Sequence, residues 1–81
     1  MTVYFADWCP FCRKLIEDLN AEQVEYTLVD VDNAPNAKEA SEFVESVNDG
    51  NRIVPTVVFS DESTMTNPPV ADVIAKLEEL A

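Results

Sequence analysis

Short segments rich in β-branched and aromatic residues alternate with longer segments whose apolar residues recur at helical spacing, and this alternation restricts the fold more than any other feature. The strand-like segments are residues 2–6 (TVYFA), 26–32 (YTLVDVD), 56–60 (TVVFS) and 64–66 (TMT). Because strand–helix–strand units cross over right-handedly, the alternation predicts a mixed four-stranded α/β sheet with helices on both faces. The expected order of elements is β-α-β-α-β-β-α.

Three helices are predicted between and after these strands. The first begins at Pro10, which suits a first helical position, and its apolar side carries Phe11, Leu15, Ile16 and Leu19. The second runs up to Gly50 and carries Ala37, Ala40, Phe43, Val44 and Val47. The third follows residues 67–69 (NPP), with an apolar stripe of Val70, Val73, Ile74, Leu77 and Leu80. Gly50, the only glycine, is expected in a left-handed cap after the second helix.

Length and charge narrow the classes of function. A chain of 81 residues predicts a single domain spanning residues 1–81. The formal net charge of −11 repels nucleic-acid phosphates and anionic lipid surfaces, so neither nucleic acid nor membrane is an expected partner. No apolar run approaches the roughly 18 residues that span a bilayer, and no signal-peptide pattern stands at the start. We expect a cytoplasmic monomer.

Cys9 and Cys12 are the only cysteines, and two residues separate them. In a reducing cytosol such a pair is more typical of catalysis or metal binding than of a structural disulfide. A zinc site needs about four ligands, whereas this chain offers two thiols and no histidine. We therefore expect no metal within one chain, although a cluster shared between two chains and external thiols stays open.

The position of Cys9 between a strand and a helix indicates thiol chemistry. The unpaired N–H groups at a helix N-terminus favour an anion, and the thiolate is the form of cysteine that attacks a disulfide. Cys12, one turn further, is expected to be within reach but more covered. This geometry predicts Cys9 as the nucleophile and Cys12 as the resolving thiol. Trp8 and Phe11 are expected to offer a docking surface, with Phe11 partly in the core.

These residues resemble the glutaredoxins, dithiol oxidoreductases with a thioredoxin fold. The resemblance rests on residues 8–12 (WCPFC), on residues 53–56 (IVPT) and on the order of elements, and it covers nearly the whole chain. It implies a cis peptide bond before Pro55, and it implies that the backbone of Val54 hydrogen-bonds a thiol ligand beside the nucleophile.

The later part of the chain is similar to a branch of that family. Ordinary glutaredoxins carry a Gly-Gly loop and acidic residues where this chain has residues 65–73 (MTNPPVADV). Residues 46–57 (SVNDGNRIVPTV), followed by residues 66–68 (TNP), resemble the mycoredoxins of actinobacteria. The resemblance implies thiol-binding residues near the cysteines and at both later segments: Trp8, Pro10, Phe11, Arg13, Val54, Pro55, Thr66, Asn67 and Pro68.

Membership of this branch implies reduction of mixed disulfides between proteins and mycothiol. Mycothiol would be the co-substrate, with no tightly bound cofactor, and an NADPH-dependent flavoprotein reductase would regenerate it. Three alternatives stay open. They are a glutathione-dependent glutaredoxin, a small redoxin reduced directly by a flavoprotein reductase, and a non-catalytic iron–sulfur carrier. The small redoxins usually carry a Ser-Gly-Phe-Arg-Pro stretch, and the carriers usually have glycine or serine where Pro10 and Cys12 stand.

Overall fold

The four strands form one mixed sheet in the order β2-β1-β3-β4. The structure is a computed structural model that describes residues 1–81. β1 (Thr2–Phe5) pairs in parallel with β2 (Thr27–Asp30) and antiparallel with β3 (Thr56–Val58). β4 (Thr64–Thr66) pairs antiparallel with β3 and forms the other edge. The predicted sheet and the predicted order of elements are confirmed.

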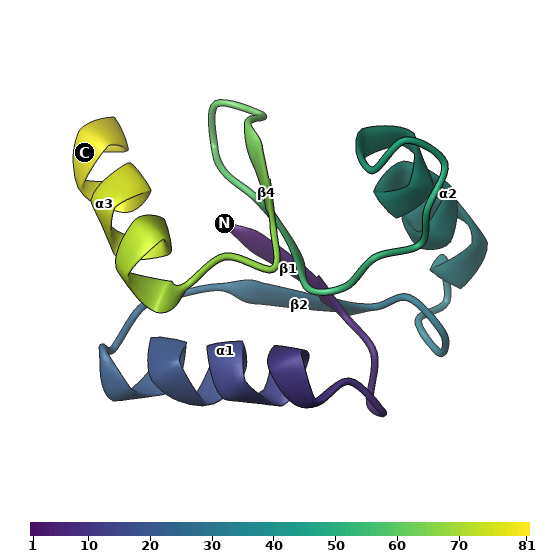
Figure 1. Cartoon of the computed structure of the whole chain (residues 1–81), viewed down its shortest axis with the longest axis horizontal. Coiled ribbons are helices and arrows are strands. Elements are labelled where there is room, and N and C mark those ends of the chain that lie inside the picture. Colours follow the sequence, from purple (N-terminus) through teal and green to yellow (C-terminus); the bar gives the residue numbers. More distant parts are fainter.

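The three helices lie on both faces of the sheet, as predicted. They are α1 (Pro10–Ala21), α2 (Ala37–Val47) and α3 (Val70–Leu80). Figure 1 shows α1 along the bottom of the view and α2 and α3 on opposite sides of the strands. β3 is two residues shorter than the sequence predicts, and β1 is one residue shorter. None of the helices is long and apolar enough to cross a membrane.

Two hydrophobic clusters hold the helices against the sheet. The first joins one face of the sheet to α1 and α3, and its buried members are Val3, Leu15, Leu19, Val57, Phe59 and Val73. The second lies under α2, and its buried members are Ala6, Cys9, Cys12, Val31, Ala40 and Val44. On that face the rings of Tyr4 and Phe43 lie 5.1 Å apart between centroids. Both cysteines therefore belong to the cluster that lies under α2.

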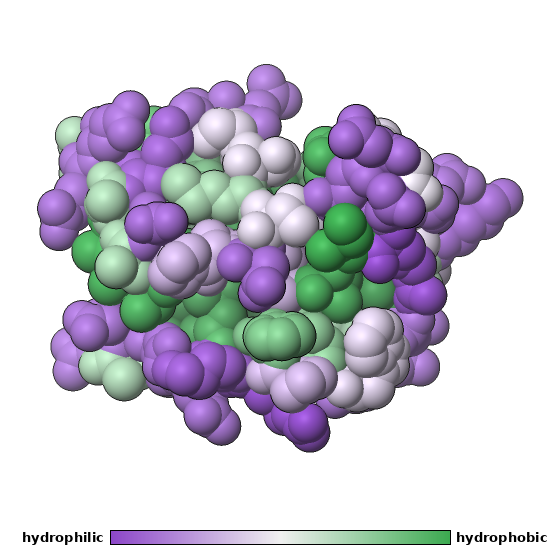
Figure 2. Space-filling view, viewed as in Figure 1, coloured by the Kyte–Doolittle hydropathy of each residue, from purple (hydrophilic) through white to green (hydrophobic).

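Polar residues cover most of the outer surface, and a few large apolar side chains remain exposed. Figure 2, in the same view as Figure 1, shows hydrophilic residues around the margin of the molecule and more apolar residues across its middle. The large apolar side chains that remain exposed are Trp8, Phe11, Leu28, Val47 and Ile53. Three of these five stand within three residues of Cys9 or next to Val54, so the exposed apolar surface concentrates near the candidate site.

β2 ends at Asp30, two residues earlier than the sequence predicts. The Asp30 carboxylate accepts hydrogen bonds from the backbone N–H groups of Asp32 and Asn33, at 2.8 and 3.0 Å. An aspartate that bonds the backbone two or three residues ahead favours a turn over a strand. The chain therefore leaves the sheet at Asp30 and delivers Asp32 to a loop.

The expected cap at the end of α2 is present, with one addition. Gly50 has a positive φ of 86°, and its N–H donates to the Glu45 carbonyl at 2.7 Å. Asp49, directly before it, also has a positive φ, of 55°. Two successive left-handed residues thus end the helix, and aspartate is one of the few side chains that enters this region readily.

Candidate active site

Four segments that are distant in the sequence meet at one end of the strands. Because β1 and β2 are parallel, the segments that follow them, with Cys9 and Asp32, leave the sheet at the same end. β3 runs in the opposite direction, so the segment before it arrives there, and β4 ends there. The cysteine pair, Val54–Pro55 and residues 66–68 are thereby brought together, although only the first of these segments carries a thiol.

Cys9 is the N-cap residue of α1. Its backbone is extended, with φ −87° and ψ 110°, and Pro10 takes the first helical position. The N–H of Cys12 donates to the Cys9 sulfur at 3.1 Å. N-cap side chains usually accept such a bond through oxygen, and here a sulfur accepts it instead. A thiolate at this position would receive both this hydrogen bond and the positive end of the helix dipole.

The two cysteines are almost equally covered, and the pKa of Cys12 is strongly raised. Cys9 is 2% exposed and Cys12 is fully buried, so the predicted order of exposure holds by a small margin. Burial, followed by a hydrogen bond to the Cys9 side chain, raises the pKa of Cys12 to about 12. Cys12 therefore keeps its proton at neutral pH, and both side chains are unpaired thiols in this structure.

The Val54–Pro55 segment forms the wall opposite the cysteines. The peptide bond between Val54 and Pro55 is cis, as the family resemblance implies. The Cys9 thiol donates to the Val54 carbonyl, with the sulfur 3.6 Å from the oxygen. The N–H of Asn67 donates to the Pro55 carbonyl at 2.8 Å. Asn67 has a positive φ of 47°, so the chain turns sharply there and stays beside Pro55.

Two aromatic side chains stand exposed beside Cys9. Trp8 is 65% exposed and Phe11 is 63% exposed. The prediction that Phe11 lies partly in the core is therefore wrong. α1 packs through Cys12, Leu15 and Leu19, which recur every three or four residues, and Phe11 lies about 100° around the helix from Cys12. Cys12, which the apolar pattern of the helix does not include, takes the inward position.

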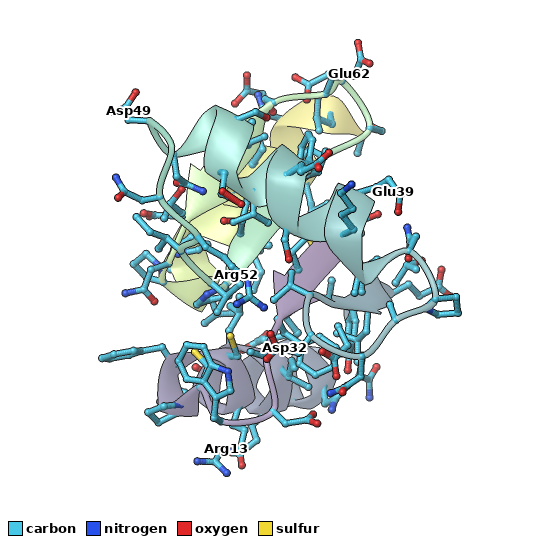
Figure 3. All side chains as sticks on the ribbon, turned by 90° about the vertical axis from the view of Figure 1, so that its right-hand side faces the viewer. Arg13, Asp32, Glu39, Asp49, Arg52 and Glu62 are labelled. Atoms are coloured by element: carbon cyan, nitrogen blue, oxygen red, sulfur yellow. The ribbon has the colours of Figure 1, made fainter.

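The side chain of Asp32, which no sequence pattern identifies, contacts both the loop of Trp8 and the segment of Arg52. Asp32 accepts a hydrogen bond from the Trp8 indole N–H at 3.0 Å, and it forms an ion pair with Arg52. Figure 3 shows the side chains of Arg52 and Asp32 pointing toward each other. The signal in the sequence is positional, because Asp32 follows a strand parallel to the one that precedes Cys9.

Asn48 is a second residue that the sequence does not reveal. Its amide nitrogen donates to the Val44 carbonyl at 2.8 Å and to the Thr56 hydroxyl at 3.2 Å. Its amide oxygen accepts from the Thr66 hydroxyl. The Thr56 hydroxyl in turn donates to the Ile53 carbonyl at 2.8 Å. This side chain joins the end of α2 to β3, to β4 and to the segment that carries Val54.

The remaining predicted residues lie around this end of the strands with different surroundings. Pro68 is half-buried and stands one residue before Pro69, the N-cap of α3. Arg13 is exposed on α1, and Figure 3 shows its guanidinium pointing away from Asp32 and Arg52. The hydroxyl of Thr66 donates its proton to Asn48, so toward a ligand this hydroxyl can only accept a hydrogen bond.

Comparison with known proteins agrees with this geometry. The glutaredoxin family profile matches residues 1–63. Mycoredoxin 1 of Corynebacterium glutamicum is 56% identical over 81 residues, an alignment that covers 100% of this chain and 96% of the relative. A protein of Mycobacterium tuberculosis whose name places it among the glutaredoxins is 46% identical, over 100% of this chain and 93% of its own length.

A helix-capping thiol, a second thiol one turn further and a cis-proline wall form an arrangement suited to the exchange of a disulfide. The matches extend over the residues that build it, from Cys9 to Pro55 and beyond. The chain is a homologue of mycoredoxin 1 and belongs to the glutaredoxin family of thiol–disulfide oxidoreductases.

Proposed function

We propose that the protein reduces mixed disulfides between mycothiol and proteins, with Cys9 as the nucleophile. The observation that carries this proposal is the full-length similarity to mycoredoxin 1, combined with a sulfur at the N-cap of α1. The protein would act with mycothiol as its co-substrate and with no tightly bound cofactor. An NADPH-dependent flavoprotein reductase would restore the mycothiol pool in the cytoplasm.

The exchange takes two displacement steps. The Cys9 thiolate attacks the mycothiol sulfur of the mixed disulfide, a Cys9–mycothiol disulfide forms, and the client leaves as a thiolate that takes up a proton. A second mycothiol thiolate then attacks the mycothiol sulfur on Cys9. This step releases mycothiol disulfide and restores the Cys9 thiolate. The reductase transfers two electrons from NADPH to that disulfide and yields two mycothiol molecules.

Cys12 is a reserve thiol in this scheme. Its raised pKa, to about 12, keeps it protonated while Cys9 reacts with the incoming disulfide. When mycothiol is scarce, Cys12 loses its proton during attack on the Cys9 sulfur, forms a Cys9–Cys12 disulfide and releases mycothiol. The pair then needs two further electrons from thiols before it can act again.

The charges around the site support mycothiol over glutathione. Glutathione carries two carboxylates and an amino group, whereas the acetylcysteine, sugar and inositol of mycothiol are uncharged. The guanidinium of Arg52 is paired with Asp32, and that of Arg13 points away from this pair. Free positive charge for a carboxylate is therefore scarce beside the cysteines.

Hydroxyl groups of mycothiol have partners of another kind. Asn67 is exposed, and the hydrogen bond from its N–H to the Pro55 carbonyl fixes its backbone beside Pro55. A side-chain amide has both donors and an acceptor for sugar hydroxyls. We therefore assign Asn67, with the backbone of Val54 and Thr66, to binding of the mycothiol moiety, while the rings of Trp8 and Phe11 contact the client.

The test compares one client protein prepared as mixed disulfides with mycothiol and with glutathione. Each substrate is assayed with mycothiol, with glutathione or with a thioredoxin reductase as the only electron source. We expect the highest kcat/KM for the mycothiol disulfide reduced by mycothiol. Equal or higher kcat/KM with glutathione would contradict the proposal, as would turnover supported by thioredoxin reductase alone.

Asn67→Gly removes the side-chain amide, keeps a residue that tolerates the positive φ, and separates recognition from chemistry in the same assay. We expect it to raise KM for the mycothiol mixed disulfide and to leave KM for the glutathione mixed disulfide nearly unchanged. Asn36→Ala is a suitable control, because Asn36 is exposed and its side chain makes no capping hydrogen bond. Equal effects of Asn67→Gly on both substrates would remove Asn67 from the mycothiol site.

A further inference from the structure

Three loops meet at the carboxylate of Asp32. One oxygen accepts the Trp8 indole N–H at 3.0 Å, and the other pairs with the guanidinium of Arg52. Arg52 also donates to the Val31 carbonyl, at 3.3 Å. Asp32 is 24 residues from Trp8 and 20 residues from Arg52 along the chain. One side chain thus joins the loop after β1, the loop after β2 and the segment before β3.

Two of these three loops form the walls of the candidate active site. Trp8 directly precedes Cys9, and Arg52 stands two residues before Val54. The Val54 carbonyl lies 3.6 Å from the Cys9 sulfur. The loop that carries Cys9 and the cis-proline segment are therefore connected in two ways. One is the direct contact between Cys9 and Val54, and the other passes through the side chain of Asp32.

The Trp8 ring has few other restraints. With 65% of its surface exposed, the side chain gains little fixed orientation from packing, and its indole N–H bonds only to Asp32. Hydrogen bonds to an ionised carboxylate are stronger than neutral ones and are directional. The Asp32 side chain is 30% exposed and that of Arg52 is 41% exposed, so solvent screens the group only in part.

Arg52 has a distinct part in this cluster. A bare carboxylate at Asp32 would place a negative charge among loops where a thiolate forms and would repel it. The guanidinium neutralises that charge, and one of its terminal nitrogens donates both to the Asp32 carboxylate and to the Val31 carbonyl.

We propose that Asp32, paired with Arg52, is a positioning residue for disulfide exchange: it holds the Trp8 ring in one orientation beside Cys9 and fixes the Cys9 loop against the Val54–Pro55 segment. It touches neither the reacting sulfurs nor the small thiol. The inference rests on Cys9 as the reacting thiol, and it holds whichever small thiol supplies electrons.

The expected signature is a change in binding more than in chemistry. Without Asp32, Trp8 samples several rotamers, and an incoming disulfide must order the ring before it binds. Asp32→Ala should therefore raise KM for a mixed disulfide about five- to tenfold and change kcat by less than about twofold. Asp32→Asn keeps an acceptor for the indole N–H, so it should recover most of the affinity.

Trp8 is the only tryptophan, so tryptophan fluorescence comes from this ring alone. Asp32→Ala should speed the local motion seen in the anisotropy decay of Trp8, while Asp32→Asn should stay close to the wild type. Glu42→Ala is the charge-matched control: Glu42 is exposed on α2 and has no ion pair within 4.0 Å. It should change neither KM nor the decay.

If Asp32→Ala lowers the stability of the protein, a double-mutant cycle between Asp32 and Trp8 still tests the proposal. Trp8→Phe keeps an aromatic ring but removes the N–H donor, so Asp32→Ala should raise KM less in that background than in the wild type. The assay uses one peptide as its mycothiol and its glutathione mixed disulfide, so it can be interpreted for either small thiol. Unchanged KM and anisotropy in Asp32→Ala, or additive effects in the cycle, would overturn the assignment.

Discussion

The backbone N–H of Cys12 lies 3.1 Å from the Cys9 sulfur and donates a hydrogen bond to it. The same turn of α1 thus supplies the thiol, the amide that stabilises its anion and the second thiol. Pro10 between them has no N–H to compete for the sulfur, and its ring suits the first helical position. The spacing of two residues between the cysteines is what makes this geometry possible.

The raised pKa of Cys12 predicts that the two thiols differ in alkylation. At pH 8 a thiol with a pKa of about 12 is ionised in roughly one molecule in ten thousand. Brief treatment of the folded, reduced protein with iodoacetamide should therefore modify Cys9 and leave Cys12 unmodified. Peptide mass spectrometry locates the adduct. In guanidinium chloride both thiols should react, and preferential modification of Cys12 in the folded protein would contradict the assignment.

Asn48 should contribute to stability through its bonds to three elements. Asn48→Ala leaves the Thr56 and Thr66 hydroxyls without this partner, and Thr56 is fully buried. We expect a loss of about 1–3 kcal/mol in the free energy of unfolding, measured by urea denaturation. Asn36→Ala, at an exposed asparagine without a capping bond, should change it by less than about 0.5 kcal/mol. Equal losses in the two variants would argue against this role.

Gly50 should resist replacement because of its backbone and not because of crowding. Its φ is 86°, and a Cβ built there meets no atom within 4 Å. Gly50→Ala should therefore lower the free energy of unfolding by about 1–2 kcal/mol, the usual penalty for a left-handed alanine. Gly50→Asn should lose less, because asparagine enters this region more readily. The prediction fails if thermal unfolding shows alanine to be as stable as glycine.

Asp61 should give folding stability a dependence on acidic pH. Hydrogen bonds from the Ser63 hydroxyl and N–H, together with Lys76, lower the pKa of Asp61 from 3.8 to about 2. Because the folded pKa lies below the unfolded one, this contribution is complete above pH 4 and is lost as pH falls toward 2. Denaturation of the wild type and Asp61→Asn between pH 2 and 7 should show a difference that shrinks with acidity. A difference independent of pH would exclude this titration.

The fold could be predicted from the sequence because its signals are local. Strand-like and helix-like periods alternate, and Pro10 marks the start of α1 while Gly50 marks the turn after α2. The end of β2 could not be predicted this way. Residues 31 and 32 continue the strand-like pattern, yet the Asp30 carboxylate bonds the backbone ahead of it and turns the chain.

The cysteines could also be identified from the sequence, but their surroundings could not. Phe11 looks apolar and helical, so periodicity assigns it to the core, whereas Cys12 takes the inward position and Phe11 is exposed. Asp32 bonds to Trp8 and Arg52, and Asn48 bonds to Thr56 and Thr66 besides its local contact with Val44. These long-range partners lie at least eight residues away along the chain. Such long-range contacts form only when the sheet is assembled, and no local sequence pattern predicts them.

The account depends most on Cys9 as the attacking thiol and Cys12 as dispensable. The direct measurement is the initial rate at which Cys9→Ser and Cys12→Ser release the protein thiol from a mycothiolated client, with mycothiol as the electron source. We expect Cys12→Ser to retain the wild-type rate within about twofold, because the second mycothiol resolves the Cys9 disulfide, and Cys9→Ser to be inactive. An active Cys9→Ser beside an inactive Cys12→Ser would contradict the mechanism.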